Sequence, residues 1–283
     1  VYMLGMVLEG GANRTFYSIG VLDAFLDKGI ACDFFVGVSA GIANGVSYIS
    51  RQRGRSLELG LRYMNDKRYM GARYFFKKEN HSYYNRSFVF DEIPNKYLPF
   101  DYKTYNEHSG GVYAVVTNLE TGKAEYLPVR GADKKWTVIQ ASCALPFMFR
   151  PMEIDGNLYM DGGCSDPLPI KFAFDKGCDK VISIITRERG YEKRTEADVK
   201  FSVMLYRKKQ AFANDLINRS SVYNASKRYL FEKEKEGKAF VFAPRDTSGW
   251  KRTESSTDAL QKMYDEGYND VLLRLDELKE FIG

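Results

Sequence analysis

The first 50 residues alternate twice between a short apolar segment and a helical pattern, with a glycine-containing turn at each join. Residues 3–8 and 33–38 are apolar and rich in strand-forming side chains, and glycines follow or end each of them. Residues 15–28 place apolar side chains at helical spacing, and residues 41–50 form a second helical segment. This alternation is typical of an α/β fold with a mainly parallel, covered sheet, and it is the class that we predict.

The rest of the chain extends the same pattern. Residues 111–118 and 180–186 are predicted to be further buried strands, and residues 122–129 a hairpin partner of the first of these. Residues 198–230 and 256–280 are predicted to be helices. No internal repeat, low-complexity tract or Pro/Gly/Ser-rich linker divides the chain, so we expect one domain.

Composition excludes several classes of protein. With 283 residues, of which 44% are hydrophobic and 28% charged, the chain is not a disordered segment, a collagen or a coiled coil. A net charge of +5 is far from that of a nucleic-acid binder. Four cysteines without a CxxC pair, and only two histidines, suggest no structural zinc site, and we expect neither a metal nor another cofactor. Without an apolar run of membrane-spanning length or a signal-peptide pattern, we expect a cytoplasmic protein.

The first chemical motif is the GxSxG sequence formed by Gly37, Ser39 and Gly41. The serine falls where an apolar strand meets a helix, and such a sharp turn exposes its hydroxyl at the end of the sheet. The N-terminus of the helix would also offer partial positive charge to a developing oxyanion. The alternative interpretation is an ordinary turn in which Ser39 caps the helix.

A nucleophilic serine requires a base, and the two histidines are poor candidates. No histidine precedes Ser39, which excludes the chymotrypsin and subtilisin orders of the triad. His81 lies in a segment rich in Lys, Arg and Tyr, and His108 in a turn-like loop before a strand, so we expect both at the surface. We therefore predict that the base is not a histidine.

A carboxylate is the remaining candidate base. Asp161 ends a short apolar segment, and Gly162 and Gly163 follow it, which allows the backbone to turn and approach closely. The alternative is a simple Asp-Gly turn. Because an aspartate of ordinary pKa, ~3.9, is a weak proton acceptor, this base requires strong stabilisation of the oxyanion elsewhere.

The loop Glu9–Thr15 can supply that stabilisation. A glycine-rich turn between a strand and a helix presents a row of backbone N–H groups, and an arginine adds positive charge. The predicted oxyanion-binding residues are Gly10, Gly11, Ala12, Asn13 and Arg14. A nucleotide-binding loop is excluded because the segment matches GxGxxG only at its first position and no GK[ST] follows.

These three motifs, in this order, resemble the patatin-like phospholipase family. Members have an Asp-Gly-Gly-Gly-x-Arg-Gly loop, a GxSxG nucleophile and an Asp-Gly-Gly or Asp-Gly-Ala sequence, which correspond here to residues 9–15, 37–41 and 161–163. The segment Ala141–Pro146 is also similar to the family's Ala-Ser-x-Ala-x-Pro block. The resemblance implies a three-layer α/β/α sandwich and hydrolysis of lipid acyl esters through a Ser39–Asp161 dyad. It covers about residues 4–186 of a single domain, 1–283, whose remaining residues, 187–283, would form a helical cap and tail.

Two departures from the family's loop bear on catalysis. Ala12 replaces the third glycine, and at positive φ an alanine costs on the order of 1 kcal/mol. Thr15 replaces the last glycine, where it can cap the following helix. A weakened oxyanion hole keeps two alternatives to a phospholipase or lysophospholipase open. One is a soluble carboxylesterase or thioesterase for small acyl substrates, and the other is a non-catalytic protein that binds a lipid or another protein.

Residues 51–86 concentrate positive charge and aromatic side chains. Ten Lys or Arg against three acids give 10 − 3 = +7 within this segment, and seven Tyr or Phe lie among them. Such a segment can contact an anionic membrane surface peripherally. The alternative is a solvated helix face with the aromatic side chains in the core. The expected partner is an acyl-ester lipid, and the oligomeric state stays open.

Overall fold

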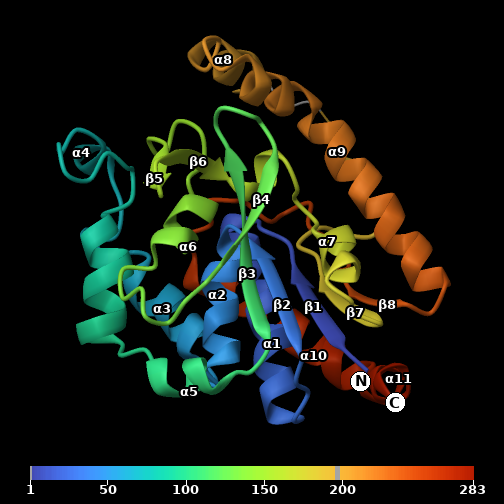
Figure 1. The fold of residues 1–283 in the computed structure, drawn as a ribbon. Helices are drawn as coiled ribbons and strands as arrows, with labels where there is room; N and C mark the ends of the chain where they lie inside the picture. Colours follow the sequence, from blue (N-terminus) through green and yellow to red (C-terminus); the bar gives the residue numbers. More distant parts are fainter. Residues whose placement is uncertain (1, 195–197) are drawn as a thin grey trace.

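The computed structural model describes residues 2–194 and 198–283, and within them a sheet of eight strands forms the centre of the molecule (Figure 1). The strand order is β5-β6-β3-β2-β1-β7-β8, and β4 pairs with β3 beside this path. Strands β1, β2, β3, β7 and β8 are parallel, whereas β4, β5 and β6 pair antiparallel to their neighbours. The strands are β1 (Leu4–Leu8), β2 (Phe34–Val38), β3 (Gly111–Asn118), β4 (Ala124–Pro128), β5 (Met152–Ile154), β6 (Asn157–Asp161), β7 (Lys180–Ile184) and β8 (Ala239–Phe242).

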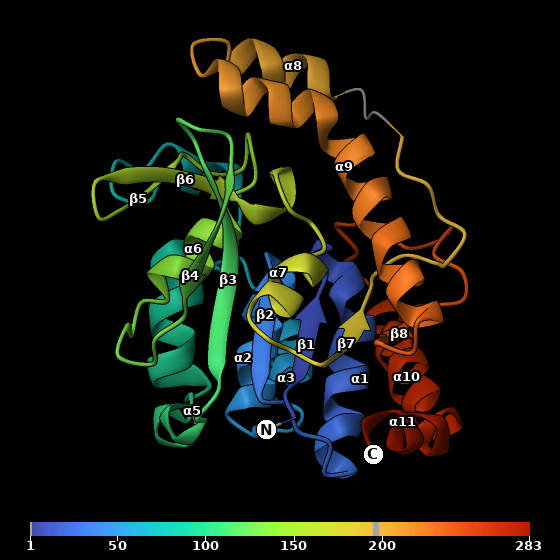
Figure 2. The same ribbon diagram turned by 45° about the vertical axis from the view of Figure 1, so that its right-hand side comes forward.

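Helices cover both faces of this sheet, which gives the α/β/α sandwich that the resemblance implied. Alternate residues of β1 show the two faces: Met6 and Leu8 pack with helices α1, α2 and α10, and Val7 packs with α7 and α9. Figure 2 shows α9 rising along the side of the sheet that carries β7 and β8. The α-helices are α1 (Phe16–Asp27), α2 (Ala40–Ile49), α3 (Arg55–Tyr63), α4 (Ala72–Phe75), α5 (Tyr102–Glu107), α6 (Thr137–Ser142), α7 (Ile170–Asp175), α8 (Asp198–Leu205), α9 (Gln210–Lys235), α10 (Thr257–Leu273) and α11 (Leu275–Ile282).

The strands predicted from sequence are confirmed, and the two predicted C-terminal helices are each divided in two. The first is interrupted at residues 206–209, where the ring of Tyr206 packs edge-on against the ring of Phe212. The second is interrupted at Arg274, whose guanidinium donates to the carbonyl of Val241 and stacks on Phe240. These tertiary contacts compete with continuation of the helix, and sequence periodicity does not reveal them.

The C-terminal part is mainly helical, as expected, but it also contributes β8 to the sheet. Strand β8 pairs in parallel with β7, and α10 packs along α1 (Figure 1). One sheet therefore includes strands from both the predicted core and the predicted cap. Among the described residues, no helix is long and apolar enough to cross a bilayer.

Strand register brings the predicted site together at the carboxyl ends of the parallel strands. Val38, which precedes Ser39, pairs with Val115 on β3, and the next residue of β3, Val116, pairs with Asp161 on β6. Because neighbouring strands lie ~4.8 Å apart, two strand spacings separate the serine segment from the aspartate. Ser39 and Asp161, which are 122 positions apart in sequence, are thus brought together at one end of the strands.

Candidate active site

Ser39 occupies the sharp turn between β2 and α2 that the GxSxG motif predicts. Its backbone has φ 52° and ψ −126°, a conformation that is costly for a residue with a side chain. Two hydrogen bonds hold it: the Ser39 N–H donates to the Oγ of buried Ser142 at 2.9 Å, and its carbonyl accepts from the N–H of Ala43 at 3.1 Å. The Ser39 side chain is half-buried at the start of the helix and does not cap it.

Glycines let three segments of backbone approach one another around this turn. A Cβ on Gly41 would lie 2.6 Å from the carbonyl oxygen of Glu9, and a Cβ on Gly162 would lie 2.2 Å from that of Val115. Both separations are too short for any side chain. Glycine at these positions therefore joins the serine turn to the Glu9 loop and the aspartate turn to β3.

The loop that follows β1 presents unpaired backbone donors beside Ser39. Within the described part of the chain, the N–H groups of Gly10, Gly11 and Ala12 donate to no protein group. The N–H of Asn13, in contrast, donates to the carbonyl of Arg252 at 3.2 Å, so in this structure it is not free to bind an oxyanion. Thr15 also differs from expectation: its hydroxyl donates to the carbonyl of Ala12 and does not cap α1.

Ala12 lies at φ +49°, in the region where glycine is favoured. We therefore expect Ala12→Gly to stabilise the fold by up to about 1 kcal/mol, because glycine removes the clash of Cβ with the backbone. The turnover number should be unchanged or higher, because the same loop conformation becomes easier to reach. Thermal unfolding and ester hydrolysis measure the two effects. A substantial loss of kcat would mean that the alanine side chain itself supports the loop.

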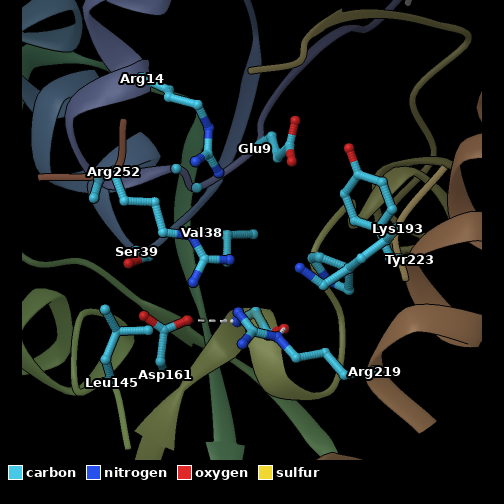
Figure 3. Close-up of a pocket in the computed structure, with 15 residues that line it drawn as sticks. Glu9, Arg14, Val38, Ser39, Leu145, Asp161, Lys193, Arg219, Tyr223 and Arg252 are labelled. Carbon is cyan, nitrogen blue, oxygen red and sulfur yellow. Dashed lines mark hydrogen bonds between the residues drawn. The ribbon is translucent and has the colours of Figure 1, made fainter. Parts of the chain in front are cut away.

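Asp161 is 1% exposed and is the last residue of β6 (Figure 3). Its Oδ1 accepts from the N–H of Gly163 at 2.8 Å, whereas Oδ2 has no hydrogen-bond partner of normal geometry within the described structure. Burial raises the pKa of this carboxyl, and the nearby Ser39 hydroxyl and the charge of Arg219 act in the opposite direction. A raised pKa makes Asp161 a better proton acceptor than an exposed aspartate.

The two histidines do not lie where a triad would require them. His108 packs near Asp33, which precedes β2, so the length of that strand, ~17 Å, separates it from the Ser39 end. His81 lies on the loop after α4, where its carbonyl accepts from the N–H of Arg150. Both side chains are half-buried, which corrects the expectation that they are surface residues.

Two pockets meet at Ser39, and Ala12 and Leu145 also line both. The larger, about 160 Å³, is mainly apolar and lies between α3, residues 88–97, α6 and the loop after α6; its lining includes Phe16, Leu59, Met64, Val89, Ile139 and Phe149. The smaller, about 70 Å³, contains Asp161 and the free N–H groups of the loop. Among the residues that the structure describes, four cationic side chains also line it: Arg14, Lys193, Arg219 and Arg252.

Sequence reasoning missed most of this cationic lining. Lys193, Arg219 and Arg252 come from segments far from the motifs, and no local pattern marks them. Ser142 lies in the segment Ala141–Pro146, which is similar to the family's Ala-Ser-x-Ala-x-Pro block, yet its contact with the Ser39 N–H depends on tertiary packing. Within the described residues, no group of three His, Cys, Asp or Glu side chains is arranged to hold a metal ion.

A model of the patatin-like phospholipase family matches residues 6–174, and the chain therefore belongs to this family. A second model, of a domain of unknown function, matches residues 209–283. Uncharacterized protein YjjU of Escherichia coli is 27% identical over 189 residues, which span 65% of this chain and 52% of YjjU. Lysophospholipase nte1 of Aspergillus terreus is 24% identical over 192 residues, 64% of this chain and 12% of that protein. The chain thus spans about half of YjjU and a small part of the lysophospholipase.

Among solved structures, VipD from Legionella pneumophila aligns with a TM-score of 0.47 at 14% sequence identity. The alignment covers 98% of this chain and 67% of VipD.

Proposed function

We propose that this protein is a serine acyl hydrolase that cleaves fatty-acyl esters of lipids through Ser39 and Asp161. One observation supports the proposal most strongly. Ser39 lies where an apolar pocket adjoins a buried aspartate and three unpaired backbone N–H groups. The first feature suits an acyl chain, the second a general base, and the third an oxyanion.

The proposed chemistry has two steps. Ser39 Oγ attacks the ester carbonyl while Asp161 accepts its proton, and the N–H groups of Gly10, Gly11 and Ala12 stabilise the oxyanion. The C–O bond to the alcohol then breaks, and Asp161 returns the proton to the leaving oxygen. In the second step Asp161 takes a proton from water, which attacks the acyl-serine, and the fatty acid leaves as Ser39 regains its proton.

The apolar pocket favours lipid esters over small acyl substrates. A cavity on the order of 150 Å³ lined by apolar side chains holds a molecule as large as benzene, so the pocket accommodates several methylene groups. Each buried methylene contributes ~0.8 kcal/mol. We therefore expect kcat/KM for p-nitrophenyl esters to rise several-fold per methylene from acetate toward octanoate. Equal kcat/KM values from acetate to octanoate would favour a small-ester hydrolase. No hydrolysis of any ester would favour a non-catalytic binding protein.

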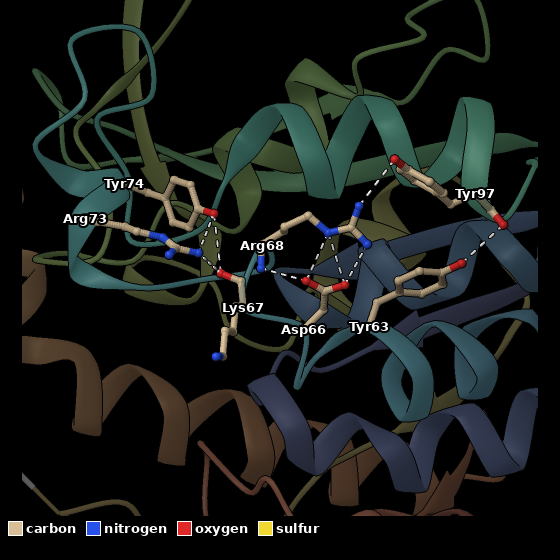
Figure 4. A network of polar contacts seen from close by, with 7 residues as sticks. All are labelled: Tyr63, Asp66, Lys67, Arg68, Arg73, Tyr74 and Tyr97. Carbon is tan, nitrogen blue, oxygen red and sulfur yellow. Dashed lines mark hydrogen bonds and ion pairs between the residues drawn. The ribbon is translucent and has the colours of Figure 1, made fainter.

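Part of segment 51–86 borders this pocket. Several of its aromatic and cationic side chains are buried or have polar partners, so fewer of them are available to contact a membrane. Tyr63, Tyr69 and Tyr74 are buried, as the alternative interpretation expected. Arg68 pairs with Asp66 at 2.7 Å, and Arg73 donates to the carbonyl of Lys67 and to Tyr74 (Figure 4). The most exposed aromatic side chain of the segment lies at the tip that follows α4, where Phe76 is 84% exposed beside two exposed lysines, Lys77 and Lys78.

We propose that this tip contacts anionic membranes. Replacing Lys77 and Lys78 together by Gln should weaken binding to phosphatidylglycerol vesicles, because each basic residue contributes about 1 kcal/mol at such a surface. Replacing Lys262 and Lys279, two exposed lysines of α10 and α11, is the matched control. Vesicle co-sedimentation at low and physiological salt measures the effect. Equal loss in both double variants, or binding that ignores salt, would leave the tip as ordinary surface.

A further inference from the structure

The apolar pocket at Ser39 runs along one face of helix α6. Trp136, Ile139 and Cys143 line it, and their spacing of three and four positions places them on the same side of the helix. Ser142, the last residue of α6, accepts a hydrogen bond from the N–H of Ser39 at 2.9 Å, so this end of the helix lies at the nucleophile. Trp136 precedes the first residue of α6 and therefore lies at the opposite end of this face.

The length of this face matches a medium-chain acyl group. Trp136 lies six positions before Ser142, which at ~1.5 Å per residue corresponds to about 9 Å along the helix axis. An extended octanoyl chain has a similar length. The volume of the pocket, about 160 Å³, also suits several methylene groups and not a long acyl chain.

A second groove begins behind Trp136 and Ile139. It has a volume of about 280 Å³ and lies between β4, α6 and the turn that joins β5 to β6; its apolar lining includes Leu127, Val138 and Ile154. Trp136 and Ile139 line both this groove and the apolar pocket, and their side chains are 5% and 2% exposed. These two side chains therefore form a wall between the two spaces.

The fold holds Trp136 in a costly backbone conformation. Its φ is 55° and its ψ 42°, in the left-handed region that bulky residues rarely adopt. Three aromatic rings pack around the indole: the ring centroids of Phe100 and Tyr105 lie 4.8 and 5.7 Å from it in edge-on contacts, and Tyr102 stacks on it at 5.6 Å. Backbone strain of this kind persists only where the surrounding structure fixes the residue, so the indole is a rigid part of the wall.

We propose that Trp136 and Ile139 form the end wall of the apolar pocket and limit the acyl group of the substrate to about the length of an octanoyl chain. This inference rests on the proposed function and names its substrate class, esters of medium-chain fatty acids. The wall excludes longer chains because a close-packed indole cannot move aside without loss of its contacts. Truncation of either side chain opens the pocket into the groove, where further methylene groups can be buried.

The experiment compares kcat/KM for p-nitrophenyl laurate and p-nitrophenyl octanoate. Wild type should prefer octanoate, and Trp136→Gly should raise the laurate-to-octanoate ratio at least about tenfold, because each additional methylene group that enters the groove adds up to several-fold. Glycine adopts positive φ at little cost, which offsets part of the lost packing. The ratio cancels any change that slows both esters alike, and a ratio equal to that of wild type overturns the wall.

Two further variants separate an opened wall from a loosened fold. Ile139→Ala removes less packing than Trp136→Gly and should raise the same ratio several-fold, and it decides the question if Trp136→Gly does not fold. Val138→Ala is the matched control, because Val138 is adjacent in sequence and lines the groove but not the apolar pocket. Its ratio should equal that of wild type. An increase as large as that of Ile139→Ala would overturn the proposal.

A fluorescence measurement tests the position of the wall without catalysis. Trp136 and Trp250 are the two tryptophans of the chain, so Trp250→Phe leaves Trp136 as the single indole. In a Ser39→Ala/Trp250→Phe protein, saturating ω-bromooctanoic acid should quench the fluorescence more strongly than saturating α-bromooctanoic acid, because bromine quenches an indole that it contacts.

The two acids carry bromine at opposite ends of the chain, so the difference between them reports which end meets Trp136. Equal quenching by both acids, or no quenching by the ω-bromo acid, would overturn the wall. If wild type hydrolyses no ester, the proposed function fails, while stronger quenching by the ω-bromo acid still supports Trp136 as the end of the pocket.

Discussion

Asp161→Asn is expected to lower kcat by at least ~10²–10⁴, the range contributed by a positioned general base. Asparagine has the same shape and can still accept the N–H of Gly163, but it takes no proton from Ser39. The substitution also removes a buried carboxyl whose pKa burial raises, so the melting temperature should not fall. Steady-state hydrolysis of a soluble p-nitrophenyl ester, measured beside thermal unfolding, separates lost chemistry from lost folding.

The matched control replaces both histidines, His81 and His108, by Gln. Because neither histidine lines the two pockets that meet at Ser39, kcat should stay within a few-fold of wild type. A double variant as inactive as Asp161→Asn would restore a histidine-based mechanism. The pH profile of wild type gives a second check: activity requires ionised Asp161, so kcat/KM should fall with decreasing pH through a pKa above the ordinary aspartate range.

Ser39→Ala is expected to abolish ester hydrolysis, because no other hydroxyl can form the acyl-enzyme at this position. The loss should be comparable to that of Asp161→Asn, since the two groups act as a unit and their effects do not add. Alanine keeps the Cβ and the backbone bonds to Ser142 and Ala43, so the free energy of unfolding should change by only about 0.5 kcal/mol. A double Ser39→Ala/Asp161→Asn variant should be no slower than either single variant. Additive losses would contradict the dyad.

The parts of this molecule that sequence predicted best are those whose chemistry is local. A strand followed by Gly-x-Ser-x-Gly and a helix requires a sharp turn, and the structure has that turn at Ser39 with positive φ. The same holds for the hairpin of β3 and β4 and for Asp161 at the end of β6. In each case adjacent residues determine the conformation, so a short window of sequence contains the information.

What sequence did not predict depends on contacts between distant segments. The N–H of Asn13 donates to the carbonyl of Arg252, which is 239 positions away in sequence. Loop composition alone would leave this N–H free to bind an oxyanion. Arg274 ends α10 because it reaches β8, and β8 itself extends the sheet from within a region whose pattern is mainly helical. The cationic pocket has the same origin, since its four cations meet only in the folded chain.

The central claim, that Ser39 is an activated nucleophile, is tested most directly by labelling with a fluorophosphonate. The reagent phosphonylates a serine only where a base and an oxyanion hole activate it. Mass spectrometry of wild-type protein should show one adduct per chain, and peptide mapping should place it on Ser39; Asp161→Asn should label far more slowly. Absence of an adduct on the wild-type protein, or an adduct on another residue, would contradict the account.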